Sequence, residues 1–184
     1  MKENFTRSFN KIIGVEGKYS NNPNDSGGET MYGITVAVAR RHGYTGNMIS
    51  MPVEVARDIY FKDYWNPNSL ESISDISYPI AEEMFDTGVN CGQVVAARFM
   101  RDGLNCFNRS NRVQPDYEEV APEGLVDRAV LAAFGKYMVK RGKVGEMVLL
   151  RFLNSLQGAH YNELRKRRIK DEEFVFGWFV NRVI

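Results

Sequence analysis

The stretch "VEGKYSNNPNDSGGETMYGIT", residues 15–35, decides how the first part of this chain folds. Glu16 stands at the end of a segment with helical periodicity, and Asn, Pro, Asp, Ser and Gly then fill most of the next dozen positions. These residues favour turns, because Gly tolerates positive φ, Pro fixes φ, and Asn and Asp side chains bond to nearby backbone groups. The stretch therefore predicts a helix end followed by a folded-back loop with room for a short hairpin.

A helix before this loop is predicted from about residue 4 to 17. Phe5, Phe9 and Ile12 recur at the spacings of three and four that are typical of an amphipathic helix. At about 100° per residue, Glu16 falls in the middle of the same apolar stripe. Partial burial and the negative end of the helix dipole both favour the protonated carboxyl. A carboxyl that holds its proton near neutral pH is suited to act as a general acid.

Two residues of the loop complete a candidate catalytic set. A general acid that cleaves a glycosidic bond usually works with a second carboxylate. Asp25 lies in a polar loop that favours its ionised form, and the hydroxyl of Thr30 could orient a water molecule beside it. The turn residues would then fold the chain so that both face Glu16 across a cleft. The alternative is a solvated Glu16 that pairs with Lys18, with Asp25 and Thr30 as ordinary turn formers.

The chain as a whole is predicted to be all-α. Helices are expected at 36–42, 50–65, 79–89, 92–106, 124–140, 143–158, 160–169 and 171–182, and a long exposed loop at 108–122. Thr35 is suited to cap the first of these helices, and Gly43 to end it in a left-handed conformation. The polar stretch 66–77 is predicted to connect two regions, 1–70 and 71–184.

Composition excludes several classes of function. Lys and Arg total 24 and Asp and Glu total 23, so no overall field attracts nucleic acid. The N-terminus lacks the continuous apolar run of a secretory signal, which predicts a cytoplasmic site of synthesis. The two histidines lie far apart in the sequence and neither cysteine is near them, so no zinc site is expected. No other metal and no cofactor is expected. Serine-hydrolase, phosphate-loop and calcium-loop motifs also fail to match.

"EGKYSNNPNDSGGETMYGIT" closely resembles the signature of the glycoside hydrolase family 108 lysozymes, E-G-G-Y-x-N-x-P-x-D-x-G-G-x-T-x-x-G-I-T. "IYFKDYW" at 59–65 and "MFDTGVNCG" at 84–92 are similar to later family segments, as is "FVFGWFVNRV" at 174–183. Two features depart from the pattern. Lys18 replaces the second glycine, and the second half lacks the D-G-x-x-G-P-x-T segment common in peptidoglycan-binding modules.

The resemblance implies a lysozyme-like catalytic region at 1–70 and a helical, peptidoglycan-binding-like region at 71–184. It implies an N-acetylmuramidase, typically a phage or prophage endolysin, that hydrolyses the β-1,4 bond between N-acetylmuramic acid and N-acetylglucosamine in peptidoglycan. Glu16 matches the family's catalytic glutamate, and Asp25 and Thr30 look like its partners. The enzyme would leave the host bacterial cytoplasm by a separate release route. Rival hypotheses are a lytic transglycosylase and a non-catalytic module for wall binding or secretion.

Further residues are expected to bind substrate. Aromatic rings that suit sugar stacking, or alternatively form core, are Tyr19, Tyr32, Tyr64 and Trp65. Asn21 joins this set because it matches the signature. Asp86 and Asn90 lie four residues apart on one helix face, where they either line the cleft or cap neighbouring turns.

The run that includes Arg165, Lys166, Arg167 and Arg168 is either a solvated face or a contact for an anionic envelope component. Stable membrane insertion is not expected. Stereochemical outcome and the choice between monomer and dimer stay open.

Overall fold

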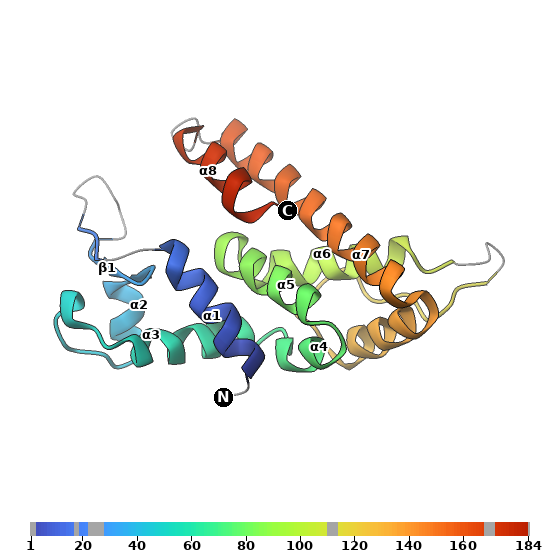
Figure 1. The fold of residues 1–184 in the computed structure, drawn as a ribbon, viewed down its shortest axis with the longest axis horizontal. Helices are drawn as coiled ribbons and strands as arrows, with labels where there is room; N and C mark the ends of the chain where they lie inside the picture. The colour runs from blue at the N-terminus through green and yellow to red at the C-terminus, as the bar shows by residue number, and fades with distance from the viewer. Residues whose placement is uncertain (1–2, 17–18, 22–27, 110–113, 168–171, 184) are drawn as a thin grey trace. The chain divides into compact units, whose positions relative to one another are not determined.

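The protein is mainly helical, as its sequence predicts. The computed structural model describes residues 3–16, 19–21, 28–109, 114–167 and 172–183 (Figure 1). Its α-helices are α1 (Glu3–Glu16), α2 (Val36–Arg41), α3 (Val53–Tyr60), α4 (Leu70–Ile76), α5 (Tyr78–Cys91), α6 (Gln93–Cys106), α7 (Arg128–Arg167) and α8 (Glu172–Arg182). A two-stranded hairpin, β1 (Thr30–Met31) with β2 (Ile34–Thr35), a 3₁₀ turn η1 (Met48–Ser50) and a π-helical turn η2 (Phe61–Trp65) complete the described elements. The expected class, all-α with a small hairpin, is confirmed.

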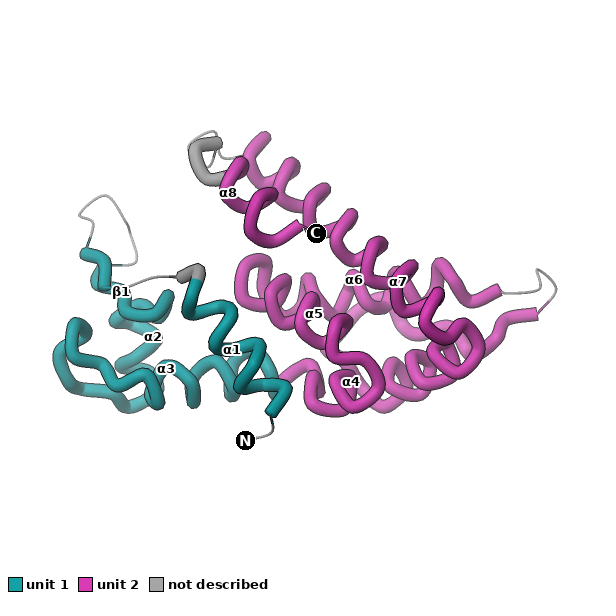
Figure 2. The backbone as a smooth tube through the Cα atoms, viewed as in Figure 1, with its two compact units in different colours: residues 1–66 teal, residues 67–184 magenta. Residues whose placement is uncertain are grey.

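The backbone forms two compact units, residues 1–66 and residues 67–184 (Figure 2). The functional division into a catalytic region at 1–70 and a peptidoglycan-binding-like region at 71–184 stays a prediction. Among the helices of the described segments, none is long and apolar enough to cross a bilayer.

An aromatic core holds the first unit together. The predicted stripe of α1 buries Phe5 and Phe9 almost completely. The Phe5 ring lies 5.1 Å from that of Phe61 and 5.4 Å from that of Trp65, and Phe9 lies 5.7 Å from Tyr60. Edge-on contacts of this kind add to the free energy gained from area burial. They fix α1 on α3 and η2, and so fix where α1 ends at Glu16.

The hairpin turns through two residues with positive φ, Tyr32 at 53° and Gly33 at 74°. Positive φ at both central positions is typical of the tight turn that suits the twist of paired strands. As predicted, Thr35 then caps α2, because its hydroxyl accepts a bond from the Val38 N–H at 3.3 Å. Gly43 adopts φ 84° just after α2, also as predicted.

The second unit is built around α5, which packs against α4, α6 and α7. Its core comprises Ile73, Ile80, Met84, Phe85, Ala97, Met100, Leu104, Val130, Phe134, Tyr137, Leu149, Leu153 and Tyr161. Helix α8 packs on the last part of α7, where Trp178 lies 4.9 Å from Tyr161. Trp178, within the segment 174–183 that resembles a later part of the family, thus packs on this half.

The interpretation of 66–77 as a polar connection was wrong, because α4 occupies most of it. Leu70 and Ile73 are fully buried, and Ser74 on the same face is almost so. A spacing of three and four gives this short helix one apolar face despite its polar composition. The expected exposed loop at 108–122 is also only partly exposed, since Tyr117 and Val120 are buried.

The expected break between 158 and 160 was wrong as well, because α7 continues to Arg167. The break expected between 140 and 143 corresponds to a kink at Gly142, whose φ of 54° and ψ of −147° are not helical.

Candidate active site

A closed loop follows the end of α1. The backbone of Ser20 pairs with that of Thr30, with N–H to O distances of 3.0 Å from Ser20 to Thr30 and 2.8 Å in return. This bridge joins the first residues after α1 to the start of β1. The loop between them therefore leaves and returns at one place, four residues along the chain from Glu16.

The catalytic residues predicted within this region are described to different extents. Glu16 is the last residue of α1, and its side chain lies outside the described part. Asp25 lies outside the described residues, as does Lys18. Thr30 is partly exposed, and its backbone is held on both sides, by Ser20 and by its hairpin partner Thr35.

Tyr19 and Glu29 interact at the base of the loop. The Tyr19 hydroxyl donates to Glu29 Oε1 at 3.2 Å. Partial burial and the neighbouring Glu29 carboxylate raise the pKa of Tyr19 above its usual value. A hydrogen bond with the exposed Asn21 offsets only part of this rise. Sequence reasoning missed Glu29, although its position directly before Thr30 was a signal for a second acidic group here.

The hairpin turn is anchored by a buried tyrosine that sequence reasoning also missed. Tyr60 on α3 donates its hydroxyl to the Tyr32 carbonyl at 3.0 Å. The Tyr64 ring stacks at a tilt on Tyr60, with 5.5 Å between centroids. Tyr32 and Tyr64 are both partly exposed, so each ring keeps some surface available for a ligand.

Trp65, in contrast, has no exposed surface for a ligand. Its ring is fully buried against Phe5 in the aromatic core of the first unit. A ring with no exposed face cannot stack on a sugar, so the core alternative applies and the stacking role expected for Trp65 is corrected.

Asp86 and Asn90 lie on α5 in the second unit and have partners within that unit. Asp86 accepts from Arg182 Nη1 at 2.7 Å and from Gln157 Nε2 at 2.8 Å, through its two carboxylate oxygens. The Asn90 amide donates to the backbone carbonyl of Asp86 at 2.7 Å. The two bonds to the Asp86 carboxylate tie α5 to α7 and α8, whereas the Asn90 bond stays within α5. Both residues thus have structural roles in this unit.

A small cavity in the first unit, of about 230 Å³, is lined by His42, Gly43, Tyr44, Val55, Asp58, Ile59 and Lys62. His42 Nε2 lies 2.9 Å from Asp63 Oδ2, a pair that links α2 to η2. The sequence gives no signal for this pair, whose members are 21 residues apart. Among the residues that the structure describes, no group of His, Cys, Asp and Glu is arranged to hold a metal ion.

The basic run lies in the last turn of α7. Lys166 pairs with Glu163 at 2.6 Å, and Arg165 donates to Asn162 at 3.3 Å. Arg168 lies outside the described residues.

One protein-family model matches part of the chain. Residues 9–92 match the model of the family described as glycosyl hydrolase 108. The match covers a little under half of the chain. The comparison with curated proteins gives no match. Among solved structures, Brucella abortus SagA has a similar fold, with a TM-score of 0.67 and 20% sequence identity over 97% of this chain and 88% of that one.

The glycosyl hydrolase 108 segment contains Glu16, Asp25, Thr30 and the residues of the closed loop. It extends past the first unit and ends at Gly92, so it also includes α4, α5, Asp86 and Asn90. The match therefore makes hydrolysis of glycosidic bonds the reaction class to test at this site.

Proposed function

We propose that the protein is an N-acetylmuramidase that hydrolyses the β-1,4 bond between N-acetylmuramic acid and N-acetylglucosamine in bacterial peptidoglycan. The family match supports glycoside hydrolysis, and the signature in residues 16–35 supports the lysozyme assignment. The observation that carries the proposal is the pairing of Ser20 with Thr30. It joins Ser20, four residues after Glu16, to Thr30, and so brackets the stretch of sequence that contains Asp25.

In this proposal Glu16 donates a proton to the leaving oxygen. Asp25 stays ionised and supports the oxocarbenium-like transition state or prepares water for attack. Thr30 positions that water, because the backbone of β1 is fixed by hydrogen bonds to both neighbours. Tyr19, Asn21, Tyr32 and Tyr64 contact the glycan strand.

Substitution of the acid tests the assignment. Glu16→Gln keeps the size of the side chain but removes the transferable proton, so lysis should fall by about 100-fold or more. The assay follows turbidity of chloroform-treated Gram-negative cells. Circular dichroism of the variant shows whether the fold is kept. Substantial lysis by a folded Glu16→Gln protein would refute the role of Glu16.

Glu29 provides the matched comparison for the second carboxylate. Its Oε1 already accepts the Tyr19 hydroxyl, so Glu29→Gln should leave activity within about tenfold of wild type while Asp25→Ala lowers it further. The reverse order would transfer the second carboxylate role from Asp25 to Glu29.

Product analysis separates hydrolysis from its rivals. A muramidase leaves reducing muramic acid ends, whereas a lytic transglycosylase leaves anhydro ends, and mass spectrometry of digested muropeptides distinguishes the two. A non-catalytic wall-binding module would leave turbidity unchanged.

We further propose an endolysin role, in which the protein stays in the host cytoplasm until a separate route releases it. Cells that express it should remain intact until chloroform opens the membrane and then lyse. Lysis that begins without permeabilisation would contradict this role.

A further inference from the structure

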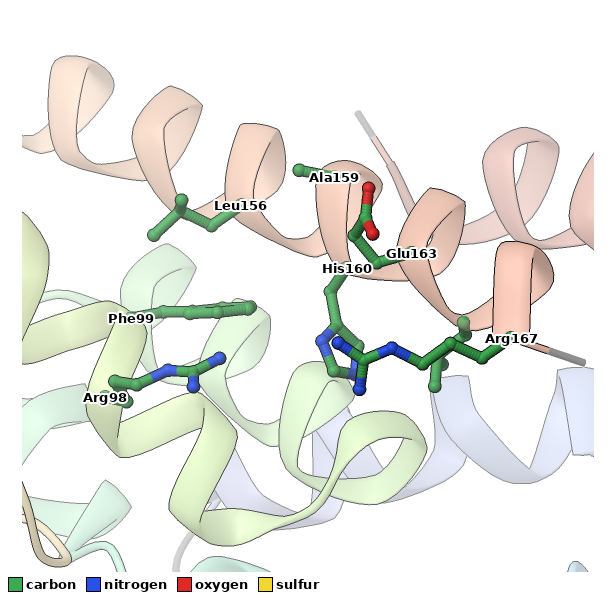
Figure 3. A pocket seen from close by; sticks show the side chains of 8 residues that line it. Arg98, Phe99, Leu156, Ala159, His160, Glu163 and Arg167 are labelled. Atoms are coloured by element: carbon green, nitrogen blue, oxygen red, sulfur yellow. The ribbon is translucent and has the colours of Figure 1, made fainter.

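A cavity of about 340 Å³ lies between α6 and α7 in the second unit, and none of its lining residues belongs to the catalytic set assigned above (Figure 3). It is lined by Arg98, Phe99, Leu156, Ala159, His160, Glu163, Leu164 and Arg167. Apolar side chains thus form part of its wall, and charged groups form the rest.

Two guanidinium groups reach the cavity from different helices. In Figure 3, Arg98 on α6 and Arg167 on α7 extend toward the His160 ring from opposite sides. Arg98 lies over the Phe99 ring, with 5.5 Å from its Cζ to the centroid. Within the described part of the chain, no ion pair with a carboxylate is found for Arg98, and Arg167 acts on Glu163 through its charge without a direct ion pair, so both guanidinium groups keep capacity for an anionic ligand.

The floor of the cavity is preformed. Phe99 is 4% exposed, and the His160 ring meets it edge-on with 6.1 Å between centroids. Because packing already orders these rings, a ligand would not have to order them on binding.

The charges favour an anion. Glu163 contributes one negative charge against the two arginines, and its pairing with Lys166 keeps it ionised by lowering its pKa. In Figure 3 the Glu163 carboxylate points away from the imidazole. One end of the cavity therefore suits a carboxylate, and the other offers an acceptor for N–H donors.

We propose that this cavity binds the carboxylate end of a short peptide with small apolar side chains, such as the alanine-rich stem peptides of peptidoglycan. The guanidinium groups of Arg98 and Arg167 hold the carboxylate, Leu156 and Leu164 contact the methyl groups, and Glu163 accepts from an amide. The choice of stem peptide as the source rests on the proposed function. A phosphate polymer fits less well, because it carries no apolar group for the wall of the cavity.

Histidine titration provides a direct readout. Burial lowers the pKa of His160 below its usual 6.5, and the charges of Arg98 and Arg167 lower it further. An anion between these groups offsets their charge, so binding must raise this pKa, and binding must become tighter as pH falls through it. Glu163, the remaining charged group that lines the cavity, is already ionised and does not change over this range.

The experiment titrates N-acetyl-D-alanyl-D-alanine into the whole protein and follows the His160 ring signal by NMR. The chain has two histidines, so the signal is assigned by its loss in His160→Asn. The same dipeptide with a C-terminal amide is the ligand control, and it should bind at least about tenfold more weakly because it cannot pair with the arginines. Equal binding of the amide would overturn the proposal.

Variants locate the site. Arg98→Gln and Arg167→Gln should each weaken dipeptide binding by about tenfold. Arg151→Gln, an exposed arginine on α7 outside the cavity, is the matched control and should bind as wild type does. A loss of the same size in the control would overturn the assignment, and so would inorganic phosphate that binds more tightly than the dipeptide.

The catalytic variant separates this site from the active site. Glu16→Gln should bind the dipeptide with unchanged affinity while its lysis is lost. If a lytically active protein failed to bind the dipeptide, only the proposed role of the cavity would be refuted. The proposed muramidase function is refuted by different results, namely absence of lysis or anhydro ends in the products.

Discussion

Tyr60 shows how one residue in the core positions the candidate active site. Its ring packs on Phe9, and its hydroxyl donates to the Tyr32 carbonyl in a turn with strained, positive φ. This hydrogen bond joins α3 to a hairpin 28 residues earlier in the chain. The hairpin carries Thr30, so the position of Thr30 depends on an interaction in the core.

Tyr60→Phe removes only that hydroxyl. Loss of the bond leaves a carbonyl unpaired, which should lower the free energy of unfolding by about 1 kcal/mol. Lysis should also fall, because β1 is held less firmly. Urea unfolding and turbidity assays measure the two effects. Tyr44→Phe loses an exposed hydroxyl bonded to the Asn47 carbonyl and serves as the control, with lysis unchanged. Equal activity of wild type and Tyr60→Phe would argue against this anchoring role.

At the scale of elements, sequence periodicity predicted the helices whose apolar face repeats over several turns. The stripe that contains Phe5 and Phe9 gave α1 within one residue at each end. Periodicity failed where the element was short. Helix α4 needs only Leu70 and Ile73 for its buried face, and its serines and acidic residues suggested a linker.

Long-range pairing set a second limit on prediction. Turn chemistry between Glu16 and Thr35 indicated a folded-back loop, but no spacing rule shows that Ser20 pairs with Thr30 or that Tyr19 bonds to Glu29. In the same way, the sequence of α6 gives no sign that Arg101 is 1% exposed. Its guanidinium is held by carbonyls of the segment 121–125 and by Asp127. Such contacts depend on segments that come together only in the fold.

The kink in α7 supplies a prediction at this scale. Gly142 has φ 54° and ψ −147°, a region that is essentially restricted to glycine. A Cβ built there meets no atom within 4 Å, so the penalty for Gly142→Ala comes from the backbone alone. We expect a loss of about 1–3 kcal/mol in the free energy of unfolding.

Gly135 on the same helix is the matched control. It also has open space for a Cβ, and its φ is not positive, so Gly135→Ala should stabilise the protein by about 0.5–1 kcal/mol. Thermal or urea unfolding measures both variants. If the two substitutions shifted stability in the same direction, the kink would not be the source of the penalty.

At the scale of the whole molecule, each of the two units contains one tryptophan whose fluorescence can follow the unfolding of that unit. The chain has two tryptophans, Trp65 in the first unit and Trp178 in the second. The second unit also contains carboxylates that are stabilised in their charged form. The N–H of Val130, together with Arg101, holds the pKa of Asp127 below its usual range, and hydrogen bonds from Lys143 and Ser77 do the same for Glu146.

Lowered carboxylate pKa values make the second unit sensitive to acid. Such a group binds protons more weakly when folded, so its contribution to stability is complete above its unfolded pKa near 4 and is lost as pH falls through its folded pKa. We therefore expect the urea midpoint reported by Trp178, in a Trp65→Phe background, to fall between pH 5 and pH 3.

Glu146 provides the control for that acid response. Its side chain is 12% exposed, and it accepts the hydroxyl of Ser77, which caps α5, at 2.6 Å. In the Trp65→Phe background, Glu146→Gln should cost about 1–2 kcal/mol at pH 7, because a charge-assisted bond is lost. It should also make the fall below pH 5 shallower, because one titrating group is gone. An acid response as steep as that of the parent would show that Glu146 does not link folding of this unit to pH.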